Sequence, residues 1–435
     1  MKKLLVVLIA LCAATAVFAE DAAKFNFNAN GFAVATNYAG VEKDSGGDFG
    51  EARFQPLFNL TTGSFDFVLK LRIDTEFGAN DDSANNDDFG SSSQFSSGTK
   101  QKAIKVLNAY GKSKVDAMEG LSLAAGVMSY DYPLVYSDNM PMFTAAYELN
   151  PITLNLYYGK LSEGDIDKGK DDSQVYIADA VIKFGESSIR PAFFYHQVRV
   201  NSYDNTTSNL QDLLGTTDPI KGSGYIYAIN ASIVAGQFGI DATGVYESAK
   251  YKDTATSEDV KIGAYAVDVA PYIKVGEAVK LTAFMTMVSG WDGSGSKDKS
   301  FLDGSLDPSS GLNTLRLYII EDCGTFGSNS AFTGGSNMRY SDNSGYSAYG
   351  LAFDGSFGPV TMKVQGAYAK AAKVASGVKK DLGIEADVNI GYALTKVSTI
   401  FVEGAYLKTG KYFENGGSVD TQNVNYIAAG MTFSI

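Results

Sequence analysis

Apolar and polar residues alternate along most of the chain. Between residues 64 and 77, Phe65 and Phe67 have one parity, whereas Asp66 and Lys70 have the other. Residues that alternate in this way lie on opposite faces of an extended strand, while helical spacing would spread the charges around an axis. The run exceeds the about five or six residues of a soluble strand and matches the roughly 9 to 11 that cross a bilayer at a tilt.

The same period of two returns along the whole chain. The runs that share it are 121–128, 142–149, 152–158, 175–184, 189–200, 225–234, 238–247, 260–272, 279–288 and 381–392. No convincing amphipathic helix of more than about two turns interrupts them. The pattern therefore predicts an all-β protein.

The connections between these runs alternate in length. Short turns are expected at 62–63, 116–120, 150–151, 185–188, 236–237, 275–278, 355–358 and 394–397. Longer polar segments separate them, among them 37–50, 78–100, 161–173, 201–222 and 410–422. Short periplasmic turns and long extracellular loops are typical of an outer-membrane barrel, whereas a soluble sandwich mixes both lengths at each end.

We therefore predict a single-chain transmembrane antiparallel β-barrel. Counting turns and loops gives about 18 strands, with about 16 or 20 as the alternatives. Segment 314–320 resembles a strand, and pairing it would raise the count to about 20. We assign this segment instead to a long external loop, 290–345.

The N-terminus indicates export. Lys2 and Lys3 precede an apolar run, and small residues near Ala19 supply a cleavage site, so residues 1–19 read as a secretory signal peptide. The barrel domain is then 20–435. Cleavage of the signal peptide would remove Cys12, so Cys323 would be the one cysteine left and could not form an intrachain disulfide.

Composition changes this picture little. Of 435 residues, 45% are hydrophobic, and the mean hydropathy of −0.07 is the average of a lipid face and a water face.

Tyr and Phe near strand ends would form the interfacial girdles of a barrel. These are Phe77, Tyr110, Phe184, Phe238, Tyr246, Tyr272, Tyr368 and Tyr406. A net charge of −13 argues against nucleic-acid binding, which requires a basic surface.

The C-terminus carries a separate signal. Gly430, Phe433 and Ile435 have the spacing of the C-terminal insertion signal of outer-membrane barrels, and the chain resembles the bacterial porin family. The chain departs from that pattern at Ala428, where a polar residue is usual, and at Ile435, where an aromatic is commoner. A weaker likeness to the alginate-export-type long-chain porins rests on residues 289–293.

The resemblance implies a Gram-negative outer membrane, contact with its lipid and assembly by the barrel-insertion machinery. The oligomeric state stays open between a homotrimer and a monomer.

A barrel of this size leaves an aqueous channel, so the expected function is passive diffusion of small polar solutes or ions. The acidic balance favours cations or neutral solutes. Charged residues of inward parity are the pore-lining candidates: Arg53, Lys70, Arg72, Asp74, Glu76, Lys105, Arg190, Asp241, Glu385, Asp387 and Glu403.

An in-folded loop is expected to narrow the pore. Segment 129–141 is aromatic, acidic and bounded by prolines, and segment 290–345 is its competitor. The constriction candidates are Tyr130, Asp131, Tyr132, Tyr136 and Asp138.

Other functions find less support. A barrel hydrolase needs a histidine beside its nucleophile. The one histidine, His196, lies in a predicted strand, and we interpret it as a polar residue of the barrel wall and not as a catalyst. A fatty-acid-type hydrophobic transporter and a surface adhesin remain the alternatives. Acidic loops such as 81–88 and 165–172 lack a full calcium-loop spacing, so no metal and no cofactor is expected.

Overall fold

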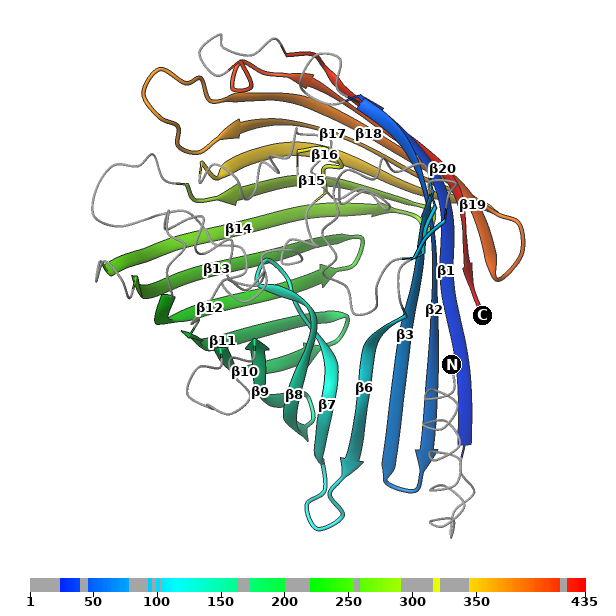
Figure 1. The fold of residues 1–435 in the computed structure, drawn as a ribbon, viewed down its shortest axis with the longest axis vertical. Coiled ribbons are helices and arrows are strands. Elements are labelled where there is room, and N and C mark those ends of the chain that lie inside the picture. Colours follow the sequence, from blue (N-terminus) through cyan, green and yellow to red (C-terminus); the bar gives the residue numbers. More distant parts are fainter. Residues whose placement is uncertain are drawn as a thin grey trace.

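The computed structural model describes most of the chain beyond the predicted signal peptide, which lies outside it together with several loops. The described residues are 24–39, 46–77, 93–95, 99–101, 104–162, 173–199, 220–253, 259–290, 316–320, 344–414 and 421–435. Within these ranges, no helix is both long and apolar enough to span a membrane. Figure 1 shows strands wrapped around a common interior.

The strands follow one another along the chain. The first ten are β1 (Lys24–Ala39), β2 (Gly46–Thr62), β3 (Phe65–Phe77), β4 (Ser93–Phe95), β5 (Thr99–Gln101), β6 (Lys105–Lys114), β7 (Leu121–Tyr132), β8 (Tyr136–Leu149), β9 (Ile152–Ser162) and β10 (Ser173–Phe184). The next ten are β11 (Ser187–Arg199), β12 (Ile220–Ala235), β13 (Phe238–Asp253), β14 (Asp259–Val275), β15 (Val279–Val288), β16 (Tyr346–Phe357), β17 (Val360–Ala371), β18 (Asp381–Ala393), β19 (Ser398–Thr409) and β20 (Val424–Ser434).

The sheet closes on itself. Each barrel strand pairs antiparallel with its neighbour in sequence, and β1 pairs with β20 from Asn30 opposite Ser434 to Ala39 opposite Asn425. The three-residue β5 continues β6 along β3, and β4 pairs with β5 outside the ring. The result is the 18-strand antiparallel barrel that the turn count predicts, and strands β1 and β20 lie side by side in Figure 1.

The short turns lie where the sequence places them. Gly185, Gly236 and Gly358 each hold a positive φ between two paired strands, a conformation that glycine adopts without the steric cost of a Cβ atom. The eight predicted turns all connect consecutive barrel strands.

Several predicted loops are corrected, and segments 161–173 and 201–222 are each shorter by the strand residues at their ends. Segment 37–50 is shorter as a loop, because β1 extends to Ala39 and β2 begins at Gly46. Segment 78–100 contains β4 and part of β5. Segment 129–141 is not a loop, since β7 and β8 extend through it and pair up to Tyr132 and Tyr136. A barrel strand can continue beyond the apolar band that faces lipid, and its residues there are polar. A polar stretch in the sequence therefore marks the end of the apolar band and not the end of the strand.

The two faces of the barrel follow the alternation. Leu351 is 69% exposed on the outer face, whereas its neighbour on the inner face, Ala352, is 8% exposed. Leu71 and Leu382 depart from the predicted exposure and are buried. Each lies at a shift in strand register: Leu382 is itself the extra residue of β18, whereas Leu71 lies opposite an extra residue, Leu107, of β6.

The aromatic girdle also needs correction. Phe184, Phe238, Tyr246, Tyr368 and Tyr406 are exposed on the outer face as predicted. A row of outer-face tyrosines crosses β9 to β12, with ring centroids 5.2 to 6.1 Å apart, through Tyr158, Tyr176, Tyr195 and Tyr225.

Two of the predicted girdle residues lie on the inner face instead. Tyr110 lines an interior cavity, and Tyr272 lies beneath the Lys280 ammonium. Their strand parity, rather than their position near a strand end, decides the face. The side chain of Phe77 lies outside the described part of the structure.

A lipid-facing charge tests these assignments. Ile229→Lys on the outer face of β12 is expected to lower the free energy of unfolding by about 2–4 kcal/mol in vesicles, because the ammonium would lie in hydrocarbon. Ser232→Lys on the inner face of the same strand is the control and should cost far less, since it lies beside Asp241. Denaturant titration of both variants measures the difference, and an equal loss would contradict the assignment of faces.

Candidate functional site

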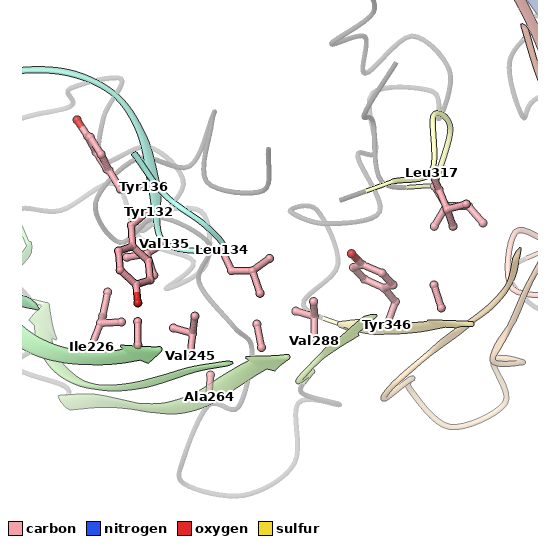
Figure 2. Close-up of a cluster of buried hydrophobic side chains, with 14 of the residues drawn as sticks. Tyr132, Leu134, Val135, Tyr136, Ile226, Val245, Ala264, Val288, Leu317 and Tyr346 are labelled. Carbon is pink, nitrogen blue, oxygen red and sulfur yellow. The ribbon is translucent and has the colours of Figure 1, made fainter. Parts of the chain in front are cut away.

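In the described part of the chain, two segments lie inside the barrel. One is the tip of the β7–β8 hairpin, residues 130–136, here called the hairpin tip. The other, residues 316–320, is called the inner turn. Figure 2 shows the hairpin tip above β12 to β14 and Leu317 of the inner turn above the wall that carries Tyr346.

The hairpin tip packs its apolar side chains on the barrel wall. Tyr132 and Leu134 are fully buried, and Figure 2 places the tip over Ile226, Val245 and Ala264. Leu134 has a φ of 62°, a conformation that costs a non-glycine residue about 1–3 kcal/mol. Burial of its side chain offsets that cost and fixes the turn against the wall.

Arg190 on β11 joins the hairpin tip to the wall. Its Nη2 lies 2.6 Å from Oδ2 of Asp179, and its Nη1 donates to the carbonyl oxygen of Asp131 at 2.8 Å. The guanidinium also lies 4.8 Å from the ring centroid of Tyr132 and 5.4 Å from that of Tyr130. A planar cation satisfies a carboxylate and stacks on aromatic rings at once, which an ammonium does less well.

Tyrosine hydroxyls complete this contact. Tyr130 donates to Oδ2 of Asp179 at 3.1 Å, and Tyr132 donates to the carbonyl oxygen of Arg190. The rings of Tyr130 and Tyr132 both meet Phe194 edge-on. The structure thus brings Arg190, Tyr130, Asp131 and Tyr132 together, four residues that the sequence placed in two separate groups.

The inner turn belongs to the segment that competed for the constriction. Leu317 and Ile320 are fully buried, and the described residues of the turn pair with no strand. Residues 316–320 therefore add no barrel strand, as the loop assignment predicts, and this part of the β15–β16 connection lies inside the barrel. Arg316 forms an ion pair with Asp268 on β14.

The acidic candidates of β18 and β19 face inward but are not exposed to the lumen. Glu385 and Asp387 are buried against the inner turn. Glu403 is buried as well, accepting hydrogen bonds from Asn389 at 2.8 Å and from the Tyr426 hydroxyl. Their carboxylates are held by protein donors.

The remaining candidates are distributed around the wall. Arg53 lies 5.0 Å from the Phe32 ring centroid, and Arg72 stands opposite Lys105 in the β3–β6 register. Asp241 accepts from Ser232 at 2.7 Å and lies 3.6 Å from the Lys280 ammonium. The side chains of three further candidates, Asp74, Glu76 and Asp138, lie outside the described part of the structure.

Lys70 lines a cavity of about 440 Å³ on the inner wall of β2 to β9. Lys112 shares this cavity with it, as do the rings of Tyr110 and Tyr157. The other polar lining residues are Asn59, Asn108, Ser122, Ser129, Thr144 and Asn155. No carboxylate is among the lining residues of this cavity that the structure describes, so its polar groups are cations, amides and hydroxyls.

A second cavity of about 570 Å³ lies beside the 276–278 turn. Lys274, Lys280 and Lys363 line it together with Glu277 and Asp354. Its charge is therefore mixed, unlike that of the first cavity.

Sequence reasoning missed Asp179, Asp268, Arg316 and Lys112. Asp179 and Asp268 share a signal that could have identified them, because each is a lone acid of inward parity within an apolar strand. An isolated charge there requires a partner from elsewhere in the chain. Arg316 carries no such signal, since its segment reads as loop.

His196 is a wall residue in this arrangement. It is fully buried, and its Nε2 lies 2.6 Å from the Tyr251 hydroxyl. Among the described residues, no group of three His, Cys, Asp or Glu side chains could hold a metal ion.

Arg190 should determine how firmly the hairpin tip is held. Arg190→Gln in a Val135→Cys, Cys323→Ser background is expected to raise the rate of Val135→Cys modification by a water-soluble maleimide roughly 10-fold, because about 1.5–3 kcal/mol of charged hydrogen bonding is lost. Arg190→Lys keeps the charge and should give an intermediate rate. An unchanged rate in Arg190→Gln would show that apolar packing alone holds the tip.

No model of a protein family matches the chain, and no curated protein matches it either. Solved structures do. OccK2 (OpdF) of Pseudomonas aeruginosa is 14% identical, with a TM-score of 0.55 over 95% of this chain and 97% of that one. A BenF-like porin from Pseudomonas fluorescens Pf-5 is 10% identical, with a TM-score of 0.56 over 95% and 99%.

OpdK of Pseudomonas aeruginosa, solved with vanillate, is 12% identical, with a TM-score of 0.52 over 94% and 98% of the two chains. At these identities the likeness is one of fold. The chain is a closed β-barrel of the kind seen in the Pseudomonas OccK proteins and the BenF-like porin.

Proposed function

We propose that the protein is an outer-membrane channel through which small polar solutes diffuse passively. The observation that carries this proposal is the closed ring of 18 strands, with an apolar outer face, charged and polar side chains among those of its inner face, and two described segments in its interior. A ring of this size leaves an aqueous passage, and inward segments reduce its width to molecular dimensions.

The alternatives fit the interior less well. A transporter for fatty acids needs a continuous apolar path, whereas the cavity of β2 to β9 is bounded by Lys70, Lys112 and three asparagines. A hydrolase needs an accessible base, and His196 is buried against Tyr251. A purely adhesive protein gives no reason for charged side chains in the interior.

The charge preference of the channel has two separate parts. The net charge of −13 predicts a preference for cations in bulk conduction. The described acids near the inward segments add little to it, because Asp179 and Asp268 are paired with arginines and Glu385 and Asp387 are buried against backbone N–H groups. A channel that prefers cations in bulk conduction can still contain a local anion site, because a few side chains at one place determine which ion binds there.

We also propose that small aromatic carboxylates are among the solutes. Two lysines line the cavity of β2 to β9 together with Tyr110 and Tyr157, a combination that fits a planar ring that carries a carboxylate. OpdK, a protein of similar fold, was solved with vanillate, a molecule of this class.

Planar bilayers test the channel proposal. Purified protein in KCl is expected to give stepwise, ohmic increases in current, and a salt gradient should give a reversal potential of the sign that marks cation preference. Folded protein that leaves the bilayer silent would refute the channel. An anion-type reversal potential would refute the cation preference alone.

Removal of the two lysines tests the carboxylate proposal. Lys70→Gln with Lys112→Gln should weaken vanillate binding about 10-fold, measured as interruption of the ionic current, because charged hydrogen bonds are lost. Lys250→Gln is the control, since its ammonium pairs with Asp259 away from the cavity. Equal vanillate affinity in the double variant and the parent would exclude this cavity as the binding site.

A further inference from the structure

The inner turn combines buried apolar side chains with backbone N–H groups that have no partner in a strand. Leu317, Ile319 and Ile320 are at most 2% exposed, so the segment is anchored in a dry environment. The N–H groups of Tyr318, Ile319 and Ile320 lie in the same environment, outside any strand ladder. Buried N–H groups need acceptors, because each one left without a partner costs about 1–3 kcal/mol.

Two carboxylates of β18 supply these acceptors. Glu385 accepts the N–H of Ile319 at Oε1, 2.6 Å away, and that of Ile320 at Oε2, 2.8 Å away. Asp387 accepts the N–H of Tyr318 at Oδ2, 3.3 Å away. Glu385 and Asp387 are two residues apart on one strand, so both side chains point to the interior. Consecutive N–H groups facing an anion form a compact anion-binding arrangement.

The turn is held to the wall at its other end as well. Arg316 pairs with Asp268 on β14, and Gln365 on β17 donates to the carbonyl oxygen of Arg316 and, at 2.7 Å, to Oδ2 of Asp387. The inner turn thus spans the interior side of the wall between β14 and β18. Release of the β18 end alone would leave the turn attached at Arg316.

The two carboxylates differ in how they can accept a proton. Within the described residues, Oδ1 of Asp387 has no hydrogen-bond partner, so a proton there displaces no donor. Each oxygen of Glu385 receives a backbone N–H, at 2.6 and 2.8 Å, so a proton on Glu385 removes the charge to which both bonds are made and weakens both. Glu385 is therefore the group through which protonation reaches the turn.

We propose that Glu385 is a positioning residue that sets the open width of the channel. Its carboxylate holds the inner turn in the interior, and protonation or removal of that charge frees the β18 end of the turn and widens the passage. The inference rests on the proposed channel function and adds a means of regulating it. External acidity is the signal that such a contact would sense.

Other charged or titratable groups surround Glu385, and they bear on the pH dependence. Asp387 neighbours it on β18, and Lys363 of β17 lies 5.8 Å from the Tyr318 ring centroid. Glu403 of β19 is bonded to Asn389 and to the Tyr426 hydroxyl. The Arg316–Asp268 pair lies at the opposite end of the turn. Of these, Glu385 and Asp387 accept N–H groups of the turn.

Single-channel recording of Glu385→Gln tests the proposal. The amide offers one acceptor and places an NH2 group against the second N–H, so the variant should conduct roughly 1.5-fold more than the parent at neutral pH. Acidification should raise the conductance of the parent to a similar level and leave that of Glu385→Gln unchanged. Asp259→Asn makes the same chemical change on an exposed carboxylate paired with Lys250, and it should behave as the parent does.

The outcomes separate the two proposals. Stepwise channels of parental conductance and parental pH response in Glu385→Gln would overturn the role of Glu385 and leave the channel function intact. A bilayer that stays silent with every variant would instead overturn the channel function.

A second variant guards against misfolding of the first. Ile320→Pro removes one donor and leaves the carboxylate in place, and it should also raise the conductance at neutral pH. If Glu385→Gln does not fold, the absence of any increase in both Ile320→Pro and the acidified parent overturns the inference.

Discussion

The backbone hydrogen bonds that close the ring between β1 and β20 are the constraint on which the rest of the structure depends. Hydrocarbon offers no partner for an open sheet edge, so every strand must find a neighbour on both sides. Closure places one parity of every strand outside and the other inside. Apolar residues such as Leu351 take the outer face, and charged residues such as Asp179 and Asp268 are confined to the interior.

A ring of this circumference encloses more volume than its own wall side chains fill. The hairpin tip and the inner turn occupy part of it, and electrostatic contacts of opposite sign hold them. A guanidinium of the wall, Arg190, fixes the hairpin tip, whereas a carboxylate of the wall, Glu385, fixes the inner turn. The charges of the interior therefore act on the chain itself as well as on solutes.

Much of the fold could be predicted from the sequence, because a period of two is a local property. The alternation located the strands and the turn positions gave the strand number, while Leu71 and Leu382, both at register shifts, are buried against expectation. The prediction missed that β7 and β8 extend through segment 129–141, and it gave the wrong face for Tyr110 and Tyr272. Polar residues occur both in loops and in strand ends beyond the apolar band, so composition alone cannot distinguish the two.

By itself, the sequence determined the all-β architecture, the inward parity of Arg190, Glu385 and Asp387, and the aromatic character of the hairpin tip. Only the tertiary structure decided which of these residues meet. Arg190 lies 59 positions from Asp131, and Glu385 lies 66 from Ile319. Such contacts depend on how segments lie across a closed ring, and no local pattern encodes that. In the folded protein, Arg190 and Glu385, which the sequence predicted as pore-lining charges, hold the hairpin tip and the inner turn to the barrel wall.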